Sequence, residues 1–430
     1  MIKKIEDKRS DEMIRRNNCA TCNGTRLHKI IDLGMMPNAN NLVAKEDLSK
    51  VKLYPLEYYW CANCNLLQQI EMADKEDLFN SNYTYITGVS KTIVEHYKKL
   101  AFTISKKVNA KDFAIVIASN DGTEIESLTS VGFGRVIGVE PSSNLADISK
   151  QKGNETINAF FSEELATELV PKYGKADVII ANNVLAHVPN PKDVLLGIKK
   201  MLKTDGCASI EVHWLRSLVK DVEIDTLYAE HYFVWTVRAM NILASSCGLA
   251  IEDIEFLPSP QAGSLRYWLR HSETLVNRSA TEQVIQTFIS QEIEEGIQNL
   301  DRMLQLNTNA NIRKEKLVKL VKQIRKDGKE IALWTAPAKM STILNFCNFT
   351  SDDIKCAYDG SRYKMNKYIP KANIPVLDEA LLRDDKLETL PAEYMIIGAW
   401  NLMDLAKEKL NWYILRGGLL INPLTVEVFS

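Results

Sequence analysis

The fold can be predicted outward from Phe113-Ala-Ile-Val-Ile-Ala118, which is followed at once by Ser119-Asn-Asp-Gly-Thr123. A short, continuous apolar run predicts a strand that is covered on both faces, as in a parallel sheet. The glycine of the loop lets the backbone approach a ligand closely. A helical stretch follows the loop, so the segment predicts a strand, a loop and a helix in that order.

The same order recurs further along the chain. Apolar runs predict strands over residues 135–139, 176–181 and 207–212, and residues 143–151 predict an amphipathic helix between the first two of these. Strands that alternate with helices indicate an α/β fold with a doubly wound, Rossmann-like sheet. Ligands of such sheets bind at the carboxyl ends of the strands. We therefore expect the site among the residues that follow each strand.

The residue that ends the second strand suits a nucleoside. Glu140 follows the first strand by about 20 residues, where a carboxylate can accept hydrogen bonds from both hydroxyls of a ribose. The sequence contains neither G-x-G-x-x-G nor G-x-x-x-x-G-K-[ST], so it indicates no cradle for a pyrophosphate. A ribose-bearing cofactor without a pyrophosphate favours S-adenosylmethionine.

Four of the eight cysteines crowd into the first 64 positions, as Cys19-Ala-Thr-Cys22 and Cys61-Ala-Asn-Cys64. Two such CxxC pairs can complete a tetrahedral four-sulfur zinc site. Four thiolates leave no open position on the ion, so the predicted zinc is structural and not catalytic. A redox pair and a chance cluster are the alternatives. The other four cysteines are isolated, and we expect them to be core thiols.

Composition narrows the class of protein. The 53 Lys and Arg nearly balance the 55 Asp and Glu, which leaves no electrostatic footprint for nucleic acid or acidic lipid. No run of 18 apolar residues is present, so we expect no membrane-spanning helix. The charged first ten residues lack the apolar core of a signal peptide. We therefore expect a cytoplasmic protein with reduced thiols.

The C-terminal part repeats the alternation after a helical arm. Residues 272–327 are charged, with apolar positions at helical spacing, and residues 331–334, 354–358, 395–399 and 419–422 predict the strands of a second, smaller sheet. This division predicts a zinc-binding module over residues 1–75, a cofactor-binding domain over 76–271, and a helical arm with a second Rossmann-like domain over 272–430.

Several motifs together resemble the sugar C-methyltransferases, which use S-adenosylmethionine to methylate nucleotide-linked 4-keto sugars. The matching segments run nearly from end to end. Besides the two CxxC pairs they are Tyr83-Thr-Tyr85-Ile-Thr-Gly-Val-Ser90, Ser119-Asn-Asp-Gly122, Asn182-Asn-Val-Leu-Ala-His-Val-Pro189, Leu227-Tyr-Ala-Glu-His-Tyr232, Gly263-Ser-Leu-Arg266, Lys339, Ala399-Trp-Asn401 and Gly417-Gly418.

The resemblance implies a role for each matched residue. Tyr83 and Tyr85 would close over the methyl donor and the acceptor, and Phe160 and Phe161 would lie against the adenine. Glu230 and His231 would be the acid–base pair, with Tyr228 or His187 nearby. The residues implied to hold the cofactor are Ser119, Asn120, Asp121, Gly122, Glu140, Asn182 and Asn183. In the family the C-terminal part helps to hold the nucleotide end of the substrate, and the candidates are Lys339, Arg362, Lys364 and Asn401.

The chemistry agrees with these residue types. Methyl transfer to carbon needs a carbanion, and a sugar offers one only next to a ketone. A base must remove the α-proton while the enolate oxygen is stabilised. Imidazole titrates near neutrality, and we expect the adjacent carboxylate to orient it and support its charge. The expected partner is a small-molecule acceptor, a nucleotide-linked keto sugar, with no nucleic acid and no membrane. The expected assembly is a monomer or a weak dimer.

Four departures from the family pattern leave the acceptor open. Ala118 stands where a glycine commonly precedes the loop, and Ala229 replaces a histidine. Gln261-Ala262 replaces a His-Gly pair, and Thr335 lies where a glycine-containing turn is usual. The cofactor side is thus nearly intact, while the acceptor side is altered. Two alternatives remain: an O- or N-methyltransferase of another small molecule, or a zinc-stabilised binding protein without catalysis.

Overall fold

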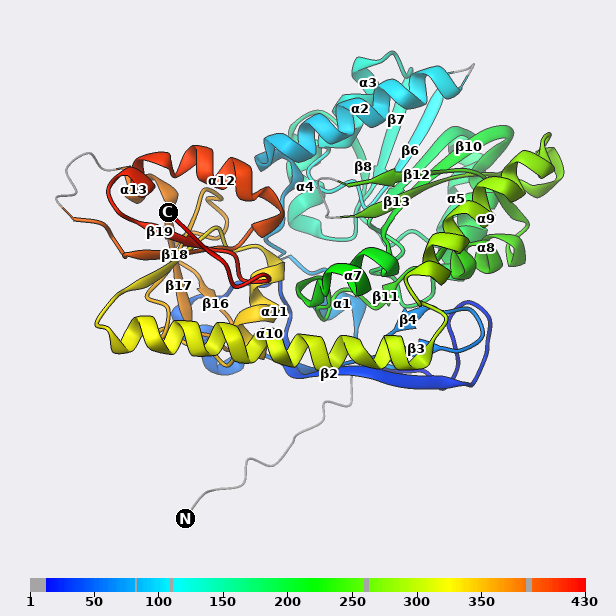
Figure 1. Ribbon diagram of the computed structural model, residues 1–430. Coiled ribbons are helices and arrows are strands. Elements are labelled where there is room, and N and C mark those ends of the chain that lie inside the picture. Colours follow the sequence, from blue (N-terminus) through cyan, green and yellow to red (C-terminus); the bar gives the residue numbers. More distant parts are fainter. Residues whose placement is uncertain (1–12, 82, 109–110, 259–262, 384–388) are drawn as a thin grey trace.

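The computed structural model describes residues 13–81, 83–108, 111–258, 263–383 and 389–430. Figure 1 shows a small sheet from the N-terminal part of the chain, a central sheet flanked by helices and a second layered sheet near the C-terminus. The α/β class with two Rossmann-like sheets is confirmed.

Seven strands form the central sheet, in the order β12-β13-β10-β9-β6-β7-β8. They are β6 (Phe113–Ile117), β7 (Arg135–Val139), β8 (Glu155–Ile157), β9 (Ala176–Asn182), β10 (Leu202–His213), β12 (Leu249–Leu257) and β13 (Ser264–His271). Strands β6 to β10 are parallel, and β13 is antiparallel to both of its neighbours. The chain runs outward from β6 to β8 and returns to β9 beside β6. A ligand is expected at this reversal.

Helices cover both faces of the central sheet, and the residues of β6 point alternately into the two cores that these helices form with the sheet. Ala114 and Val116 pack with the residues of α2 and α3, whereas Ile115 and Ile117 pack with those of α5, α6 and α8. All five residues of β6 are buried, which confirms the reading of its apolar run. The helices of this part are α2 (Lys91–Lys107), α3 (Thr123–Ser130), α4 (Ser143–Gln151), α5 (Glu163–Tyr173), α6 (Pro191–Met201), α7 (Leu215–Asp221) and α8 (Val237–Ser246).

The N-terminal sheet contains one strand from far along the chain. Its order is β11-β4-β3-β2, with β2 (Leu27–Pro37), β3 (Leu53–Cys61), β4 (Leu67–Gln68) and β11 (Phe233–Val234). Strand β11 begins two residues after His231, so the sheet that carries the cysteine pairs also holds the segment with the predicted acid–base pair. A two-stranded sheet of β1 (Met13–Arg15) and β5 (Glu71–Ala73) and the short helix α1 (Lys75–Leu78) complete this part.

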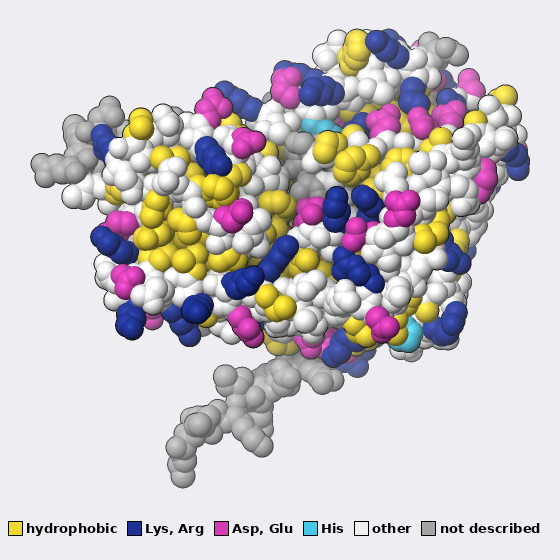
Figure 2. All heavy atoms as spheres, in the orientation of Figure 1, with side chains coloured by type: hydrophobic (Ala, Val, Ile, Leu, Met, Phe, Trp, Pro, Cys, Tyr) yellow, Lys and Arg dark blue, Asp and Glu magenta, His cyan; other side chains and the backbone are white. Residues whose placement is uncertain are grey.

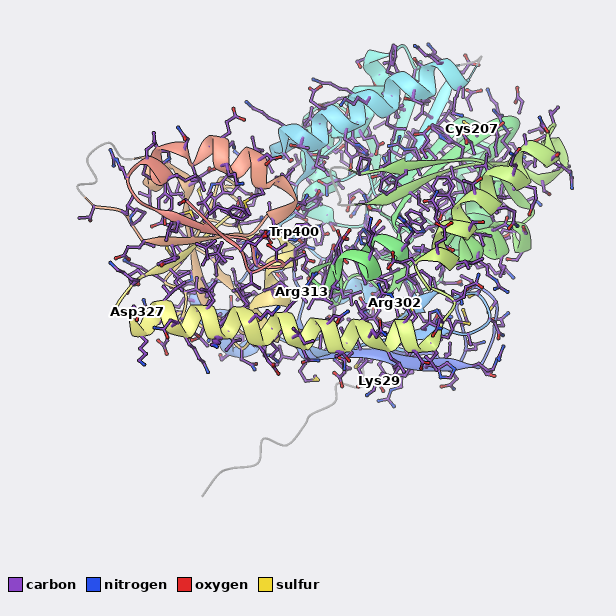
Figure 3. The ribbon with its side chains drawn as sticks, in the orientation of Figure 1. Lys29, Cys207, Arg302, Arg313, Asp327 and Trp400 are labelled. Atoms are coloured by element: carbon purple, nitrogen blue, oxygen red, sulfur yellow. The ribbon has the colours of Figure 1, made fainter. Side chains whose placement is uncertain are left out.

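The predicted helical arm is two helices, α9 (Arg278–Glu294) and α10 (Leu300–Lys326). Residues of α10 share one core with β2 and with the C-terminal sheet, and Figure 1 shows α10 running along both. Arg302 and Arg313 of α10 donate hydrogen bonds to the carbonyls of Val219 (3.2 Å) and Asp221 (2.5 Å) in α7, near the centre of Figure 3. The arm therefore ties the three parts together.

The C-terminal sheet has the order β16-β17-β15-β14-β18-β19-β20. Its strands are β14 (Ile331–Trp334), β15 (Ala357–Asp359), β16 (Tyr368–Ile369), β17 (Ile374–Asp378), β18 (Tyr394–Ile397), β19 (Leu419–Ile421) and β20 (Val428–Phe429), and its helices are α11 (Ala338–Phe346), α12 (Met403–Lys409) and α13 (Asn411–Leu415). The strand predicted over 354–358 begins only at Ala357, because Ile354 closes a turn by donating to the carbonyl of Thr350.

The surface agrees with the balanced composition. Figure 2 shows Lys and Arg side chains interspersed with Asp and Glu over the face drawn. Across the described ranges, no helix has both the length and the apolar character needed to cross a membrane. Short 3-10 helices complete the chain at Lys45–Lys50, Thr87–Val89, Ile224–Thr226, Ser272–Thr274, Glu379–Arg383 and Trp400–Leu402.

Candidate active site

The four N-terminal cysteines meet in one buried cluster. Their Sγ atoms all lie within 4.8 Å of one another. The short contacts join the two pairs, with 3.4 Å between Cys19 and Cys64 and 3.6 Å between Cys22 and Cys61. A tetrahedral zinc with bonds of about 2.3 Å needs four sulfurs at such separations. The donor set fits structural zinc as predicted, and it holds the first CxxC knuckle against the second.

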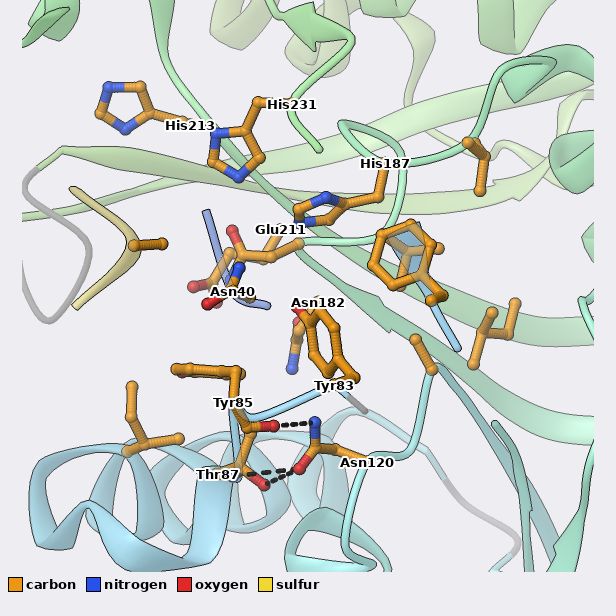
Figure 4. Close-up of a pocket in the computed structure, with 18 of the residues that line it drawn as sticks. Asn40, Tyr83, Tyr85, Thr87, Asn120, Asn182, His187, Glu211, His213 and His231 are labelled. Carbon is orange, nitrogen blue, oxygen red and sulfur yellow. Dashed lines mark hydrogen bonds between the residues drawn. The ribbon is translucent and has the colours of Figure 1, made fainter. Parts of the chain in front are cut away.

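A single cavity of about 370 Å³ lies at the carboxyl ends of β6, β7, β9 and β10 and extends to the C-terminal sheet. Figure 4 shows part of its lining. Most of the predicted site residues line it, namely Tyr83, Tyr85, Asn120, Glu140, Phe160, Phe161, Asn182, Asn183, His187, Tyr228 and His231. Ser119, Asp121, Gly122 and Glu230 are not among the lining residues.

Glu140 organises the cofactor edge of the cavity. One carboxyl oxygen accepts from the backbone N–H of Asn120 (2.8 Å) and the other from that of Ser142 (2.7 Å). A carboxyl group has further lone pairs, so these bonds leave capacity for ribose hydroxyls. Burial raises the pKa of Glu140 to about 7, against the effect of its hydrogen bonds. The residues at this edge thus fit an adenosyl cofactor.

Asn120 does not point its amide at a ligand. Its Oδ1 accepts from the N–H of Thr87 (3.0 Å), and its Nδ2 donates to the carbonyl of Tyr85 (3.1 Å), as the dashed lines in Figure 4 mark. The loop after β6 therefore holds the segment that carries Tyr83 and Tyr85 over the cavity. The tyrosine positions were implied by resemblance, and this link explains how they are kept there.

The other loop residues shape the loop and do not line the cavity. Asp121 forms an ion pair with Lys152 (2.9 Å) and accepts from the hydroxyl of Thr123 (2.8 Å). Gly122 has a φ of 83° and precedes the first turn of α3. Ser119 packs closely on Gly138, because a Cβ atom added at Gly138 would lie only 2.3 Å from Ser119 Oγ. The side chains of Asp121 and Ser119 and the backbone of Gly122 therefore hold the loop in place, and the assignment of these three residues to the cofactor stays a prediction.

His231 is held by its neighbours in the turn before β11. Its Nδ1 lies 2.6 Å from the carbonyl of Thr226, which can only accept, so Nδ1 carries the proton. Its Nε2 lies 2.6 Å from the Tyr228 hydroxyl, which then donates. The Tyr228 ring stacks on the imidazole with centroids 3.8 Å apart. Burial, with the nearby His187, lowers the pKa of His231 well below its ordinary value, so the ring is a neutral base.

His187 is the second imidazole of this group. The two ring centroids are 4.6 Å apart, and Figure 4 shows both rings at the same wall of the cavity. His187 Nδ1 lies 2.7 Å from the backbone carbonyl of Glu230, so it too carries its proton on Nδ1. Burial lowers the pKa of His187 to about 4. Both imidazoles are therefore uncharged at neutral pH.

The expectation that Glu230 orients His231 is wrong. The buried Glu230 carboxyl accepts from the backbone N–H of Ala39 (3.1 Å) and from the backbone (2.8 Å) and side-chain (3.1 Å) N–H groups of Asn40. These two neighbouring residues direct their side chains apart: Glu230 reaches the turn after β2, whereas His231 reaches the cavity. Asn40 consequently lines the cavity, although no local sequence signal marked it.

Two buried polar groups beside the cavity went unassigned from sequence. His96 Nε2 and Arg266 Nη2 both contact Glu211 Oε2, at 2.8 and 2.9 Å. His213 Nε2 lies 3.1 Å from Glu223 Oε2, near His231 in Figure 4. Glu211 and Asn182 are paired in the register of β10 and β9, and this alignment of strand ends is the signal that could have joined Glu211 to the site.

The C-terminal sheet brings positive charge to the other end of the cavity. Lys339, Lys364 and Asn401 line it, whereas Arg362 is exposed outside it. Lys364 Nζ lies 3.1 Å from Asp359 Oδ2 and donates to the carbonyl of Ala336 (3.0 Å). Within the described residues Lys339 Nζ is buried without a hydrogen-bond partner. The ammonium lies 5.1 Å from the centre of the Trp400 ring, but without a hydrogen-bond acceptor in a cavity wall it still favours an anionic ligand.

The positions that depart from the family pattern lie in different parts of the structure. Ala118 lines the cavity with a φ of 54°, and Thr335 has a φ of 68°, so both adopt the left-handed conformation that glycine tolerates best. The Thr335 Oγ1 accepts from the N–H of Ala399 (3.1 Å), which holds that turn. Ala229 is buried in the core and does not line the cavity. Gln261 and Ala262 lie outside the described residues.

Replacing Cys61 with serine is expected to abolish zinc binding and to lower the thermal midpoint, because a structural zinc site contributes directly to folding. Atomic absorption and thermal unfolding of the purified protein measure both. Cys356→Ala, which removes a buried thiol of the C-terminal part, should keep its zinc. A Cys61→Ser protein with its full complement of zinc would contradict the site.

Replacing Glu230 with alanine is expected to lower the free energy of unfolding by about 2 kcal/mol, because buried N–H groups lose their acceptor. Urea denaturation measures the change. Glu57→Ala, on a partly exposed position of β3, is the matched control and should stay within about 0.5 kcal/mol of the unaltered protein. Equal stability of the two variants would show that the Glu230 contacts contribute nothing.

Solved methyltransferases resemble part of the chain. Magnesium protoporphyrin IX methyltransferase ChlM of Synechocystis PCC 6803 with bound SAM is 13% identical with a TM-score of 0.31, and covers 41% of this chain and 77% of that chain. The CcbJ methyltransferase of Streptomyces caelestis is 12% identical with a TM-score of 0.33, and covers 41% of this chain and 89% of that chain.

Family matches cover consecutive parts of the sequence. They are a zinc binding domain over residues 19–79, a methyltransferase domain over 117–254 and a C-methyltransferase C-terminal domain over 260–425. C-methyltransferase NovU of Streptomyces niveus is 26% identical over 415 residues, which is 95% of each chain. This chain is therefore an S-adenosylmethionine-dependent methyltransferase with a structural zinc module, and these matches support its resemblance to the sugar C-methyltransferases.

Proposed function

We propose that the enzyme methylates a carbon next to a ketone, with His231 as the base and a nucleotide-linked 4-keto-deoxysugar as the acceptor. The observation that carries the proposal is that one cavity joins the cofactor edge of the central sheet, two neutral imidazoles and the lysines of the C-terminal sheet. Its volume of about 370 Å³ lies within the range of small-molecule sites.

His231 has the properties that proton abstraction needs. Its Nε2 lone pair is available once the Tyr228 hydroxyl turns from the imidazole to the acceptor. The α-proton then moves to Nε2, the C–H electron pair passes to the carbonyl oxygen, and the Tyr228 O–H stabilises the enolate by donating to it. The carbonyl of Thr226 keeps hold of Nδ1–H, and His187 stays uncharged beside the new imidazolium.

The cofactor supplies a methyl group on a sulfonium, a good leaving group. When bound, it would supply this methyl group to the enolate carbon, so that a C–C bond would form as the C–S bond broke and the ketone was restored. The proton on His231 then returns to solvent. Tyr83 and Tyr85, held over the cavity by Asn120, would align donor and acceptor and exclude water.

Charge separation along the cavity supports an anionic acceptor. Carboxyl groups of Glu140 and Glu211 line the cofactor end, which suits a cation, whereas Lys339 and Lys364 line the opposite end. A diphosphate between a nucleoside and a sugar would place its charge against these lysines. Such sugars are intracellular metabolites, so the cytoplasm is the proposed compartment.

Deuterium exchange tests the reaction type. With a nucleoside diphosphate-linked 4-keto-6-deoxyhexose in deuterated water and no methyl donor, the enzyme is expected to exchange one α-proton. His231→Asn should lower that rate by at least about 100-fold, the usual contribution of a general base. His28→Asn, outside the cavity, is the matched control. Unchanged methylation by His231→Asn would refute the base, and a product methylated on oxygen would favour the O-methyltransferase alternative.

The pH profile tests the protonation state. A base must be unprotonated, and the pKa of His231 is lowered, so the rate should stay level as pH falls from 8 to about 6, below the ordinary histidine pKa of about 6.5. The measurement is kcat/KM for the acceptor across this range. With the cofactor saturating, so that the titration of Glu140 near pH 7 does not limit the rate, an acid limb at or above about pH 6.5 would exclude His231 as the base, since ordinary imidazoles titrate there.

A further inference from the structure

A buried carboxyl holds the asparagine at the floor of the cavity. Asn182 is the last residue of β9, and its side chain projects into the cavity beside Tyr83 (Figure 4). Its Nδ2 donates to Glu124 Oε1 at 2.7 Å. Glu124 lies in the first turn of α3, only 5% exposed, and is not among the lining residues of the cavity.

This hydrogen bond decides which atom of the amide is left for a ligand. The Glu124 oxygen accepts, so it draws the N–H₂ group of Asn182 toward itself and turns Oδ1 the other way. In the described part of the chain Oδ1 is buried without a hydrogen-bond partner. A buried acceptor left unpaired is unusual, and it indicates that a donor arrives with the ligand.

The surroundings favour a cationic donor. Glu211, opposite Asn182 in the register of β10 and β9, shares its carboxyl with His96 and Arg266. One guanidinium thus lies beside two buried carboxyls, those of Glu211 and Glu124. Burial, followed by the charge of Glu211, raises the pKa of Glu124 to about 8. A positive ligand group near Asn182 would stabilise the charged form of Glu124, which burial and Glu211 otherwise disfavour.

We propose that Glu124 is a positioning residue for the cofactor: it turns Asn182 so that Oδ1 receives the ammonium group of the amino-acid end of S-adenosylmethionine. The ammonium is the cationic donor of that molecule, and Asn182 lies at the carboxyl end of the strand next to the cofactor loop. The proposal rests on the cofactor alone and is independent of the acceptor and of the His231 base.

Calorimetry with two ligands tests it. S-adenosylhomocysteine carries the amino-acid end, whereas 5′-deoxy-5′-methylthioadenosine shares the adenosyl part and lacks that end. Glu124→Leu is expected to bind S-adenosylhomocysteine at least tenfold more weakly and methylthioadenosine within twofold of the unaltered enzyme. Glu124→Gln keeps an oxygen for Asn182 Nδ2, so it should restore the affinity to within threefold. Ser127→Ala, which removes a hydroxyl from the same helix, is the control and should leave both affinities unchanged.

A second variant tests the proposal in case the Glu124→Leu protein does not fold. Asn182→Ala removes the proposed acceptor directly and should weaken S-adenosylhomocysteine at least tenfold while sparing methylthioadenosine. In the folded double variant Glu124→Gln, Asn182→Ala, the loss should equal that of Asn182→Ala alone. Equal weakening of both ligands by either single variant would mean a general distortion of the loop and would overturn the proposal. Unchanged affinity for S-adenosylhomocysteine would overturn it as well.

Discussion

The buried carboxyl of Glu230 is the constraint on which the arrangement of this enzyme depends. A carboxyl group cannot leave water without hydrogen-bond partners, and Glu230 finds them in the backbone and side chain of residues 39–40. The same turn carries His231 into the cavity, enters the N-terminal sheet as β11 and accepts a bond from Thr342 of α11 through the carbonyl of Leu227. One short segment therefore joins the zinc module, the methyltransferase sheet and the C-terminal domain.

In both Rossmann-like sheets a carboxyl group accepts the same pair of backbone hydrogen bonds, but the charge next to it differs. At the end of the second strand of each sheet, a carboxyl accepts from the loop after the first strand and from the residue two positions further on. Glu140 does so with Asn120 and Ser142, and Asp359 does so with Ala336 and Ser361. The difference is Lys364, whose ammonium lies against Asp359. Glu140 keeps free lone pairs for a ribose, whereas the acid of the second sheet is already neutralised and its edge presents positive charge. The two strand ends thus differ in charge although their backbones make similar hydrogen bonds.

Much of the fold and of the candidate site could be predicted from local sequence, because the patterns that indicate them span only a few residues each. The apolar run of β6 was recognisable from five consecutive residues, and the zinc site from two CxxC pairs. Eleven residues assigned to the cofactor or to catalysis line the cavity. The direction of a side chain could not be predicted in this way. Asp121 turns to Lys152, and Glu230 turns away from the histidine beside it. The strand over 354–358 starts late because its first residues close a turn, which an apolar pattern does not reveal.

By itself the sequence predicted the fold class, the four-cysteine cluster and the resemblance to a family, since each depends on residue types at fixed short spacings. The family resemblance implied the imidazoles, and the strand ends placed several polar residues at the site, because parallel strands end at a common edge. The tertiary structure alone showed which of these polar groups contact one another. Glu230 meets Asn40 across 190 positions of sequence, and Glu124 meets Asn182 across 58. Such contacts depend on how separate elements pack, and a buried polar group takes whichever partner that packing brings within reach.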